Sequence, residues 1–356
     1  MKYVALKDVC KINMGQSPDS SSYNENGEGI PFFQGNADFG ERYPVTRVWC
    51  NAPTKIAQSE DILISVRAPI GALNYAKEKC CIGRGLAAIT PDKSKVSLEF
   101  VYWFLKGKNA ELKSKGTGST FKAISKKILE EILIPDVGFD KQHEYAQMLE
   151  KIYVIIQTRK QELQKLDELI QSRFVEMFGD PVANDKEWTT LPLEEACKTI
   201  VDCPHSTPSY TTENTGFMCI RTSIVKKNKI LWDDIEYIPE DEFIKRIQRK
   251  KPEIGDVVYT REGAILGIAA IIDRECNVAL GQRSMLLSPD ANKCLSEFLC
   301  VAMNCDSFLD NALKGIAGSA SPHINVGDIK SFKMIMPPIE LQNQFADFVQ
   351  QVDKSK

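Results

Sequence analysis

Two small groups of residues have the types and spacing that chemistry requires. Pro91-Asp92 followed by Glu111-Leu112-Lys113 matches a pattern of nucleases whose carboxylates hold Mg²⁺. A later Pro289-Asp290 has no Glu-x-Lys behind it, and the residues around Glu111 are typical of a helix end and a lysine-rich loop, not of a strand. Cys203 and His205 could act as nucleophile and base, but no orienting group is identifiable. We interpret both groups as coincidental.

The sequence contains no other recognisable catalytic or metal-binding motif. Its eleven cysteines and three histidines include no CxxC pair, whereas a structural zinc site needs four ligands at short paired spacings. Reduced, buried thiols explain the cysteines better. No Walker A sequence and no G-x-G-x-x-G is present, and the one Pro-Pro pair, Pro337-Pro338, lacks the Asn/Asp-Pro-Pro-aromatic pattern of a methyltransferase. We therefore expect a chain without catalytic residues and without a bound metal.

Length and composition are typical of a globular protein with two domains. The chain has 356 residues, and domains average roughly 150 residues. Hydrophobic residues make up 43% and charged residues 26% of the sequence. No apolar run reaches the roughly 18–20 residues of a membrane helix, and the first residues lack the apolar segment of a signal peptide. We expect a cytoplasmic protein without a membrane partner.

Charge is distributed unevenly although the total is nearly neutral. The formal net charge of −3 does not indicate a generally basic, nucleic-acid-binding chain. Residues 106–127, however, contain seven lysines and a single acid, Glu111, around the small-residue turn at 116–120. A lysine run is usually a solvated face, but the turn inside it favours a polar binding loop.

The two halves of the chain repeat each other. Matching segments occur in the same order, and the offset between them drifts slowly, as expected for two diverged copies with small insertions. The matches, at offsets from 195 to 200, are residues 61–66 with 256–261, 89–92 with 287–290, 99–100 with 297–298, 118–119 with 318–319, and 145–146 with 345–346.

Each copy has the pattern of a β-rich α+β domain. Short runs of Ile, Leu and Val bounded by Gly and Pro predict buried strands. Apolar residues at helical spacing then predict one short helix near the end of each copy. The predicted strands are at 61–66, 85–89, 256–260 and 285–287, and the predicted helices are at 98–105 and 295–302.

Between the copies lies a long helix. Residues 141–178 contain no Gly or Pro, and at 1.5 Å per residue they would extend roughly 57 Å. Gly179-Asp180-Pro181 ends the pattern. A second amphipathic segment follows Pro337-Pro338 and is about half as long. We expect the organisation 1–138, first globule; 139–180, long helix; 181–337, second globule; 338–356, shorter helix.

The two helices are predicted to pair as an antiparallel coiled coil. Their apolar residues recur at alternating spacings of three and four, interrupted by Arg159 and Arg173. Because the second helix is shorter, part of the first seam would remain unpaired, and we expect the chain to self-associate or to bind a partner there. The seam residues are Leu149, Ile152, Ile156, Leu163, Leu166, Ile170 and Met177 on the first helix and Leu341, Phe345, Phe348 and Val352 on the second.

Over nearly its whole length the chain resembles the specificity (S) subunit of type I restriction–modification systems. The end of the long helix is the most specific feature, and the duplicated order of the motifs supports it. The motifs are at residues 15–18, 65–71, 83–86, 169–181, 202–208 and 337–342.

The resemblance implies a non-catalytic, DNA-binding chain. Each globule would be a target recognition domain that reads one half of a split, asymmetric site in double-stranded DNA. The helices would dock two methyltransferase (M) subunits, which bind S-adenosylmethionine and methylate adenine. Restriction (R) subunits, using ATP and Mg²⁺, would cut unmodified DNA. Two such heads should be spaced by about one DNA turn, ~34–36 Å, or a multiple of it.

Polar residues on loops near these motifs are the candidates for base contacts, because base edges are read by hydrogen bonds. Several of them, beside Pro or Gly, are also ordinary turn residues, and Arg67 and Arg261 also fit surface ion pairs. In the first copy the candidates are Gln16, Ser17, Gln34, Arg67, Arg84, Lys115, Thr117, Ser119, Thr120 and Lys122. In the second copy they are His205, Ser206, Thr207, Tyr210, Arg221, Arg261, Gln282, Arg283, Ser319, Ser321 and His323.

A coiled-coil scaffold that binds only proteins is the alternative function. It accounts for the helices, but it does not explain two duplicated globules with polar, glycine-rich loops.

Overall fold

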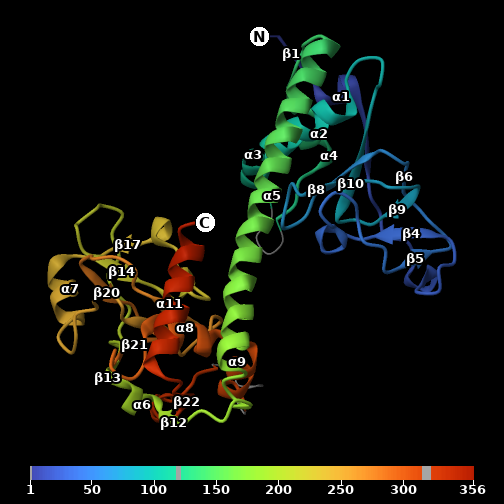
Figure 1. Cartoon of the computed structure of the whole chain (residues 1–356). Coiled ribbons are helices and arrows are strands. Elements are labelled where there is room, and N and C mark those ends of the chain that lie inside the picture. The colour runs from blue at the N-terminus through green and yellow to red at the C-terminus, as the bar shows by residue number, and fades with distance from the viewer. Residues whose placement is uncertain (1, 118–121, 315–321) are drawn as a thin grey trace. The chain divides into compact units, whose positions relative to one another are not determined.

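The computed structural model describes residues 2–117, 122–314 and 322–356. They form two compact units, Met1–Thr158 and Arg159–Lys356, shown in Figure 1. The boundary falls inside the longest helix, α5 (Phe139–Phe178). The predicted long helix is confirmed. It is not a separate segment, because Ala146 belongs to the hydrophobic core of the first unit and Ile170 to that of the second.

A four-stranded antiparallel sheet lies at the centre of the first unit. Its strands, in spatial order, are β2 (Cys10–Met14), β10 (Leu86–Pro91), β7 (Ile62–Ser65) and β8 (Leu73–Tyr75). The strands predicted at 61–66 and 85–89 are confirmed. Ile62 and Ile64 pack in one hydrophobic cluster with the helices, whereas Leu63 packs in another on the opposite face. Both faces are buried, which explains why the strands are apolar without alternation.

A second sheet packs on the Leu63 face and contains the parallel pair β4–β9. Its strands, in order, are β3 (Tyr23–Asn24), β5 (Trp49–Cys50), β4 (Ile30–Phe33), β9 (Cys80–Ile82) and β6 (Ile56–Ala57). A separate antiparallel pair joins β1 (Tyr3–Ala5) to β11 (Leu133–Pro135).

Short helices complete the first unit. They are α1 (Leu6–Val9), α2 (Leu98–Gly107), α3 (Asn109–Ser114) and α4 (Lys126–Glu130). The helix predicted at 98–105 is α2. The Ser97 hydroxyl caps it by accepting a hydrogen bond from the Phe100 N–H at 3.2 Å, as expected for an N-cap serine.

The second unit repeats this topology, as the duplicated sequence predicts. Its central sheet has the order β13 (Cys197–Asp202), β21 (Ser284–Pro289), β18 (Val257–Thr260) and β19 (Ala269–Ile271). Its outer strands are β14 (Met218–Ile220), parallel to β20 (Val278–Leu280), with β17 (Glu236–Tyr237), β15 (Val225–Lys226) and β16 (Lys229–Ile230). The pair β12 (Thr190–Pro192) and β22 (Lys333–Ile335) matches β1 and β11.

The helices of the second unit follow the same order with one addition. They are α6 (Leu193–Ala196), α7 (Glu240–Arg246), α8 (Ser296–Asn304), α9 (Asp306–Ala312), α10 (Val326–Lys330) and α11 (Ile339–Asp353). The predicted helix at 295–302 is α8, and α11 is the predicted shorter helix. The addition is α7, which lies between β17 and β18.

A buried glutamine near the start of α5 and another near the start of α11 connect each helix to the globule that precedes it. The Gln142 side-chain oxygen accepts from the Ser97 N–H at 2.8 Å, and its amide donates to the Val137 carbonyl at 2.8 Å. Gln342 repeats these bonds with the Leu295 N–H and the Pro337 carbonyl, each at 2.9 Å. Because an unpaired buried amide is costly, the four bonds fix where each helix begins.

Within the second unit, α11 runs antiparallel to the end of α5. Phe345, near the start of α11, packs its ring 5.5 Å from those of Phe174 and Phe178. At the other end, Lys356 Nζ lies 2.6 Å from Asp167 Oδ1, and Arg159 donates to the Lys356 carbonyl at 2.9 Å. The predicted antiparallel pairing is confirmed for this part of the seam.

One part of the predicted seam is packed in the core, and the other part is exposed to solvent. Ile170, Phe345 and Val352 are buried, and Leu166, Met177, Leu341 and Phe348 pack against the same core, while Leu163 is half-buried. Leu149, Ile152 and Ile156 are exposed. At about 100° per residue, they continue the seam on one helix face. We define the exposed stripe as Tyr145, Met148, Leu149, Ile152, Ile155 and Ile156.

Cysteines behave as small apolar residues. Ten of the eleven are buried, and Cys276 is half-buried. Burial raises the pKa of the Cys10 and Cys80 thiols to about 12. Within the described ranges, no group of three or more side chains is placed to hold a metal ion, and no helix is both long and apolar enough to span a membrane.

Candidate nucleic-acid interface

Both carboxylates of the nuclease-like pattern accept hydrogen bonds from neighbouring residues. Glu111 lies in α3, where Lys108 and Lys115 each donate to it at 2.7 Å. These bonds lower the pKa of Glu111 to about 2. Asp92 accepts from both the N–H and the hydroxyl of Ser94. The helical placement of Glu111 agrees with the interpretation that the pattern is coincidental, and it also pairs Lys115, a candidate DNA contact, with Glu111.

The first unit has a cleft that collects four of the predicted DNA contacts. Ser17, Gln34, Arg67 and Arg84 line a cleft of about 560 Å³. They follow the ends of β2, β4, β7 and β9, respectively. Because β2 and β7 are both antiparallel to β10, their carboxyl ends meet at one edge of the sheet, and this brings residues from distant parts of the sequence together.

Both arginines of the cleft present donors to solvent. Arg67 and Arg84 are exposed, and among the described residues no carboxylate lies within ion-pair distance of either. Asp38 also lines the cleft, but it accepts from the Gln34 and Gly35 N–H groups at 2.7 and 3.2 Å. Guanidinium groups left unpaired in a polar cleft are suited to base edges or phosphates.

Glycines allow the loops of the cleft to approach one another. The Gly85 N–H donates to the Gln34 carbonyl at 3.1 Å, and a Cβ on Gly85 would lie 2.3 Å from that oxygen. A Cβ on Gly15 would lie 2.1 Å from the Gly83 carbonyl oxygen. Gly15 and Gly85, which follows Arg84, must therefore lack a side chain for the loops of Gln34 and Arg84 to meet in one cleft.

The remaining candidates of the first unit surround this cleft or cannot be placed. Thr117 and Ala123 exchange main-chain hydrogen bonds, and Ala123 also forms a bridge with Arg67, so Thr117 and the exposed Lys122 lie beside the cleft. Gln16 is exposed, with its carbonyl accepting from Thr54. Ser119 and Thr120 lie outside the described residues.

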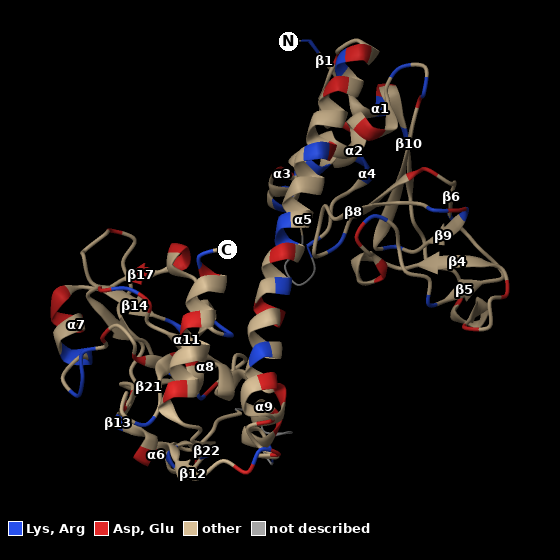
Figure 2. Cartoon of the chain, in the orientation of Figure 1, with Lys and Arg blue, Asp and Glu red and all other residues tan. Residues whose placement is uncertain are grey.

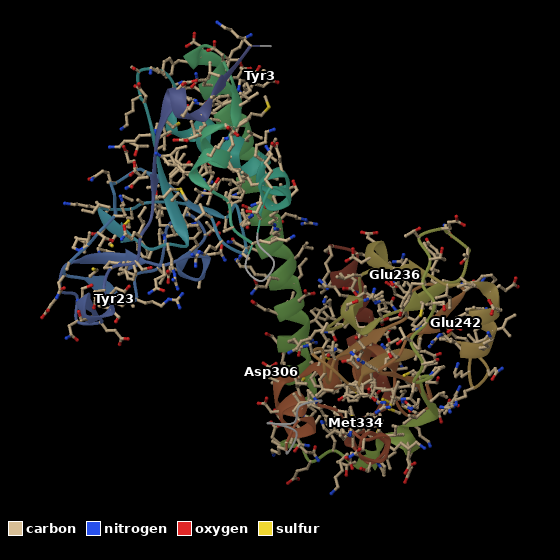
Figure 3. All side chains as sticks on the ribbon, turned by 180° about the vertical axis from the view of Figure 1, so that it is seen from behind. Tyr3, Tyr23, Glu236, Glu242, Asp306 and Met334 are labelled. Atoms are coloured by element: carbon tan, nitrogen blue, oxygen red, sulfur yellow. The ribbon has the colours of Figure 1, made fainter. Side chains whose placement is uncertain are left out.

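Most candidates of the second unit lie on connected, exposed loops. The Thr207 hydroxyl donates to Gln282 at 3.2 Å, and Arg221 stacks 5.1 Å from the ring centre of Tyr210. Arg221 also pairs with Glu236, which Figure 3 labels. The other placed candidates are His205, 3.0 Å from Asp202; Ser206, whose carbonyl accepts from Arg246; Arg283; and His323. Ser319 and Ser321 fall in the range that the structure does not describe.

Arg261 is a correction to the predicted contacts. It is only 5% exposed, and its guanidinium is held by Asp202 at 2.9 Å and by Glu262 at 2.8 Å. A side chain held inward cannot present its donors to a base edge. Arg261 therefore supports the loop, and the ion pair that was the alternative interpretation is buried, not on the surface.

Three features of the interface were missed from the sequence. Asn36 lines the first cleft, and its position between small residues after β4 was the available signal. Glu262 projects beside Arg261 and forms a bridge with His323. A basic run at residues 245–251 begins in the last turn of α7 and continues beyond it, where Figure 2 shows lysine and arginine together. Its exposed Arg249 donates to the Asp202 carbonyl at 3.1 Å.

Comparison with known proteins assigns the class. The sequence pattern of the family described as type I restriction modification DNA specificity domain matches residues 1–168 and 185–356. The chain belongs to this family, and the duplicated units are its two copies of the domain.

Individual relatives agree with the family. The chain is similar to the putative type I restriction enzyme MjaX specificity subunit of Methanocaldococcus jannaschii, with 47% identity over 157 residues, or 44% of this chain and 37% of that protein. It is similar to the MjaIX specificity subunit of the same organism, with 23% identity over 97% of this chain and 85% of that protein. The chain therefore spans about a third of the first relative and most of the second.

A solved structure shares the fold. The type I restriction-modification S subunit from M. genitalium aligns with 99% of this chain and 89% of its own, with a TM-score of 0.52 and 16% sequence identity. At this identity the similarity concerns the fold alone, which supports two α+β units with long helices.

Proposed function

We propose that this chain is the DNA specificity subunit of a type I restriction–modification complex. The observation that carries the proposal is one sheet framework, present twice, that holds different polar side chains at the ends of its strands. Two unlike heads would read two unlike half-sites and therefore a bipartite, asymmetric sequence in double-stranded DNA. Base-edge hydrogen bonds would supply the specificity, and Lys and Arg contacts to phosphate would supply affinity.

Catalysis would belong to partner subunits. In this proposal two M subunits dock on the helices, bind S-adenosylmethionine and methylate adenine at N6. R subunits would use ATP and Mg²⁺ to cut unmodified DNA. The chain itself would bind no cofactor and work in the cytoplasm. The paired state of Glu111 and the burial of Cys203 support a non-catalytic role.

Long-read methylation mapping tests this function. DNA exposed to the chain together with its M subunit is expected to carry N6-methyladenine at a split, asymmetric motif. The signal should disappear when the chain is omitted. If the intact chain binds the M subunit but no motif appears, the proposal is wrong and the protein-binding scaffold becomes the better explanation.

The exposed stripe favours self-association as an additional property. Farther along α5, the same seam packs against the antiparallel helix α11. A second antiparallel helix with apolar residues at the same spacing would therefore fit the exposed stripe. The stripe of a second copy meets this requirement, and two-fold symmetry makes such a contact self-complementary. We propose that it pairs two copies of the chain when no M subunit is bound.

An adjacent residue provides a matched control for this contact. Ile155→Asp is expected to convert a dimer into a monomer in sedimentation experiments, because it buries a charge in the seam. Val154→Asp should leave the dimer intact, since the Val154 side chain is rotated by about 100° around the helix from that of Ile155. The two side chains are similarly exposed, at 67% and 51%. A wild-type chain that remains monomeric at all concentrations, or equal effects of both substitutions, would exclude this interface.

A further inference from the structure

The two units hold their polar reading residues on the same main chain, although the side chains differ. We propose that Arg67 and Glu262 are equivalent specificity-determining residues of opposite hydrogen-bond polarity. The first unit would then select a base edge that accepts hydrogen bonds, and the second a base edge that donates them. This inference rests on the proposed function, because it assigns roles within its DNA-reading surfaces.

Main-chain hydrogen bonds establish the equivalence of the preceding residues. The Val66 carbonyl accepts from the Ile124 N–H at 2.9 Å, and the Arg261 carbonyl accepts from the Ile324 N–H at 2.9 Å. The Val66 N–H donates to the Gly85 carbonyl at 2.9 Å, and the Arg261 N–H donates to the Arg283 carbonyl at 3.0 Å. Gly85 and Arg283 each immediately precede the equivalent strand, β10 or β21. Residues 66 and 261 therefore occupy the same place in the fold.

The next residue in each unit is also equivalent. Arg67 forms an isolated antiparallel bridge with Ala123, and Glu262 forms the same bridge with His323. Arg67 lines the first cleft and is exposed. The Glu262 side chain is 29% exposed. One fold position thus presents a guanidinium in the first unit and a carboxylate in the second.

Other reading positions have changed as well. Gly83 and Gly281 each donate at 2.8 Å to the carbonyl that ends a parallel strand, Phe33 or Ile220, and this fixes the positions that follow. The resulting equivalent pairs are Gln34 with Arg221 and Arg84 with Gln282. Arginine and glutamine have therefore exchanged places, which is what two heads that read different bases require.

Hydrogen-bond chemistry makes residues 67 and 262 the most discriminating pair. An arginine only donates and fits the O6 and N7 acceptors of guanine, whereas a glutamate only accepts and fits the N4 amino group of cytosine. Glutamine does both and fits adenine. Arg67 and Glu262 cannot make the same hydrogen bonds to one base, because one side chain only donates and the other only accepts. Glutamine and arginine both donate, so their exchange changes base preference less.

The surroundings of Glu262 hold its carboxylate in place. Glu262 Oε1 lies 2.8 Å from Arg261 Nη2, and the buried Arg261 is itself fixed by Asp202 at 2.9 Å. The ion pair with Arg261 fixes the direction in which the Glu262 carboxylate presents its acceptor oxygens. Orientation by a buried neighbour is the arrangement expected of a residue that must be preorganised for recognition.

Two conservative substitutions test the inference. The full chain in complex with its M subunit is used to select bound molecules from a library of random duplexes. Glu262→Gln should change one position of the second half-site from cytosine toward adenine by about tenfold or more, and leave the first half-site unaltered. Arg67→Gln should change one position of the first half-site from guanine toward adenine by a similar factor, and leave the second unaltered. Each variant is thus the control for the other.

The outcomes separate this inference from the function on which it rests. If the wild-type complex enriches no sequence, the proposed function and the inference are both wrong. If the wild-type complex enriches a bipartite motif that neither substitution alters, the inference alone is wrong. A substitution that weakens both half-sites equally, at an unchanged melting temperature, would also contradict it, because a specificity-determining residue acts on one base position.

Discussion

Replacing Phe345 by alanine is expected to lower the free energy of unfolding of the second unit by about 3–5 kcal/mol. Phe345 is fully buried and joins α11 to α5 through Phe174 and Phe178. Phe174 and Phe178 also contact Phe298 of α8, so the ring of Phe345 closes an aromatic cluster that connects three helices. Truncation leaves a cavity that these rings cannot fill without losing their edge-to-face contacts.

Urea unfolding followed by circular dichroism measures this effect. Val175→Ala is the matched control, because Val175 lies beside Phe174 on the same part of α5 and is 51% exposed. It should cost far less, since little apolar surface is lost from the core. Equal destabilisation by the two substitutions would show that α11 does not depend on the aromatic cluster.

Removing the two arginines of the first cleft is the prediction with the next largest effect. Arg67→Ala and Arg84→Ala should each weaken binding to the specific site by about 1–3 kcal/mol, which is roughly 5–150-fold in Kd. The reason is that both guanidinium groups lie in the same cleft without a carboxylate partner among the described residues. Their donors are therefore available to DNA and gain no compensation inside the protein when DNA is absent.

Fluorescence anisotropy at one fixed salt concentration is the appropriate measurement, because protein–DNA affinity depends steeply on salt. Lys160→Ala serves as the control. Lys160 is an exposed residue of α5, and its removal deletes one positive charge outside the cleft. If Arg67→Ala weakens binding to specific and unrelated DNA by the same factor, Arg67 contacts phosphate and not a base edge.

The main elements could be predicted from the sequence because each is marked locally. Runs of Ile, Leu and Val ended by Gly or Pro gave β7, β10, β18 and β21, and the absence of Gly and Pro over residues 141–178 gave α5. The insertion α7 was not predicted, because it has no counterpart in the first copy and therefore no repeat to support it.

The candidate site was less predictable, because the type of a residue does not determine whether its side chain points into the core or toward solvent. Arg261 was expected to contact DNA, yet the repeat aligns it with Val66, which is 3% exposed. That alignment already indicated an inward position. Glu262, aligned with Arg67, was overlooked because an acidic residue is not the usual choice for a surface facing DNA. The position within the repeat was more informative than charge at both residues.

The buried glutamines have a consequence for how such proteins can diversify. Gln142 and Gln342 each hold a helix against the globule that precedes it, and no residue that the structure describes belongs to the main hydrophobic cores of both units. A genetic crossover between the codons for Thr158 and Arg159 would therefore cut neither core. Recombination at this point can exchange one whole half for a foreign one while every packed contact inside each half is inherited intact.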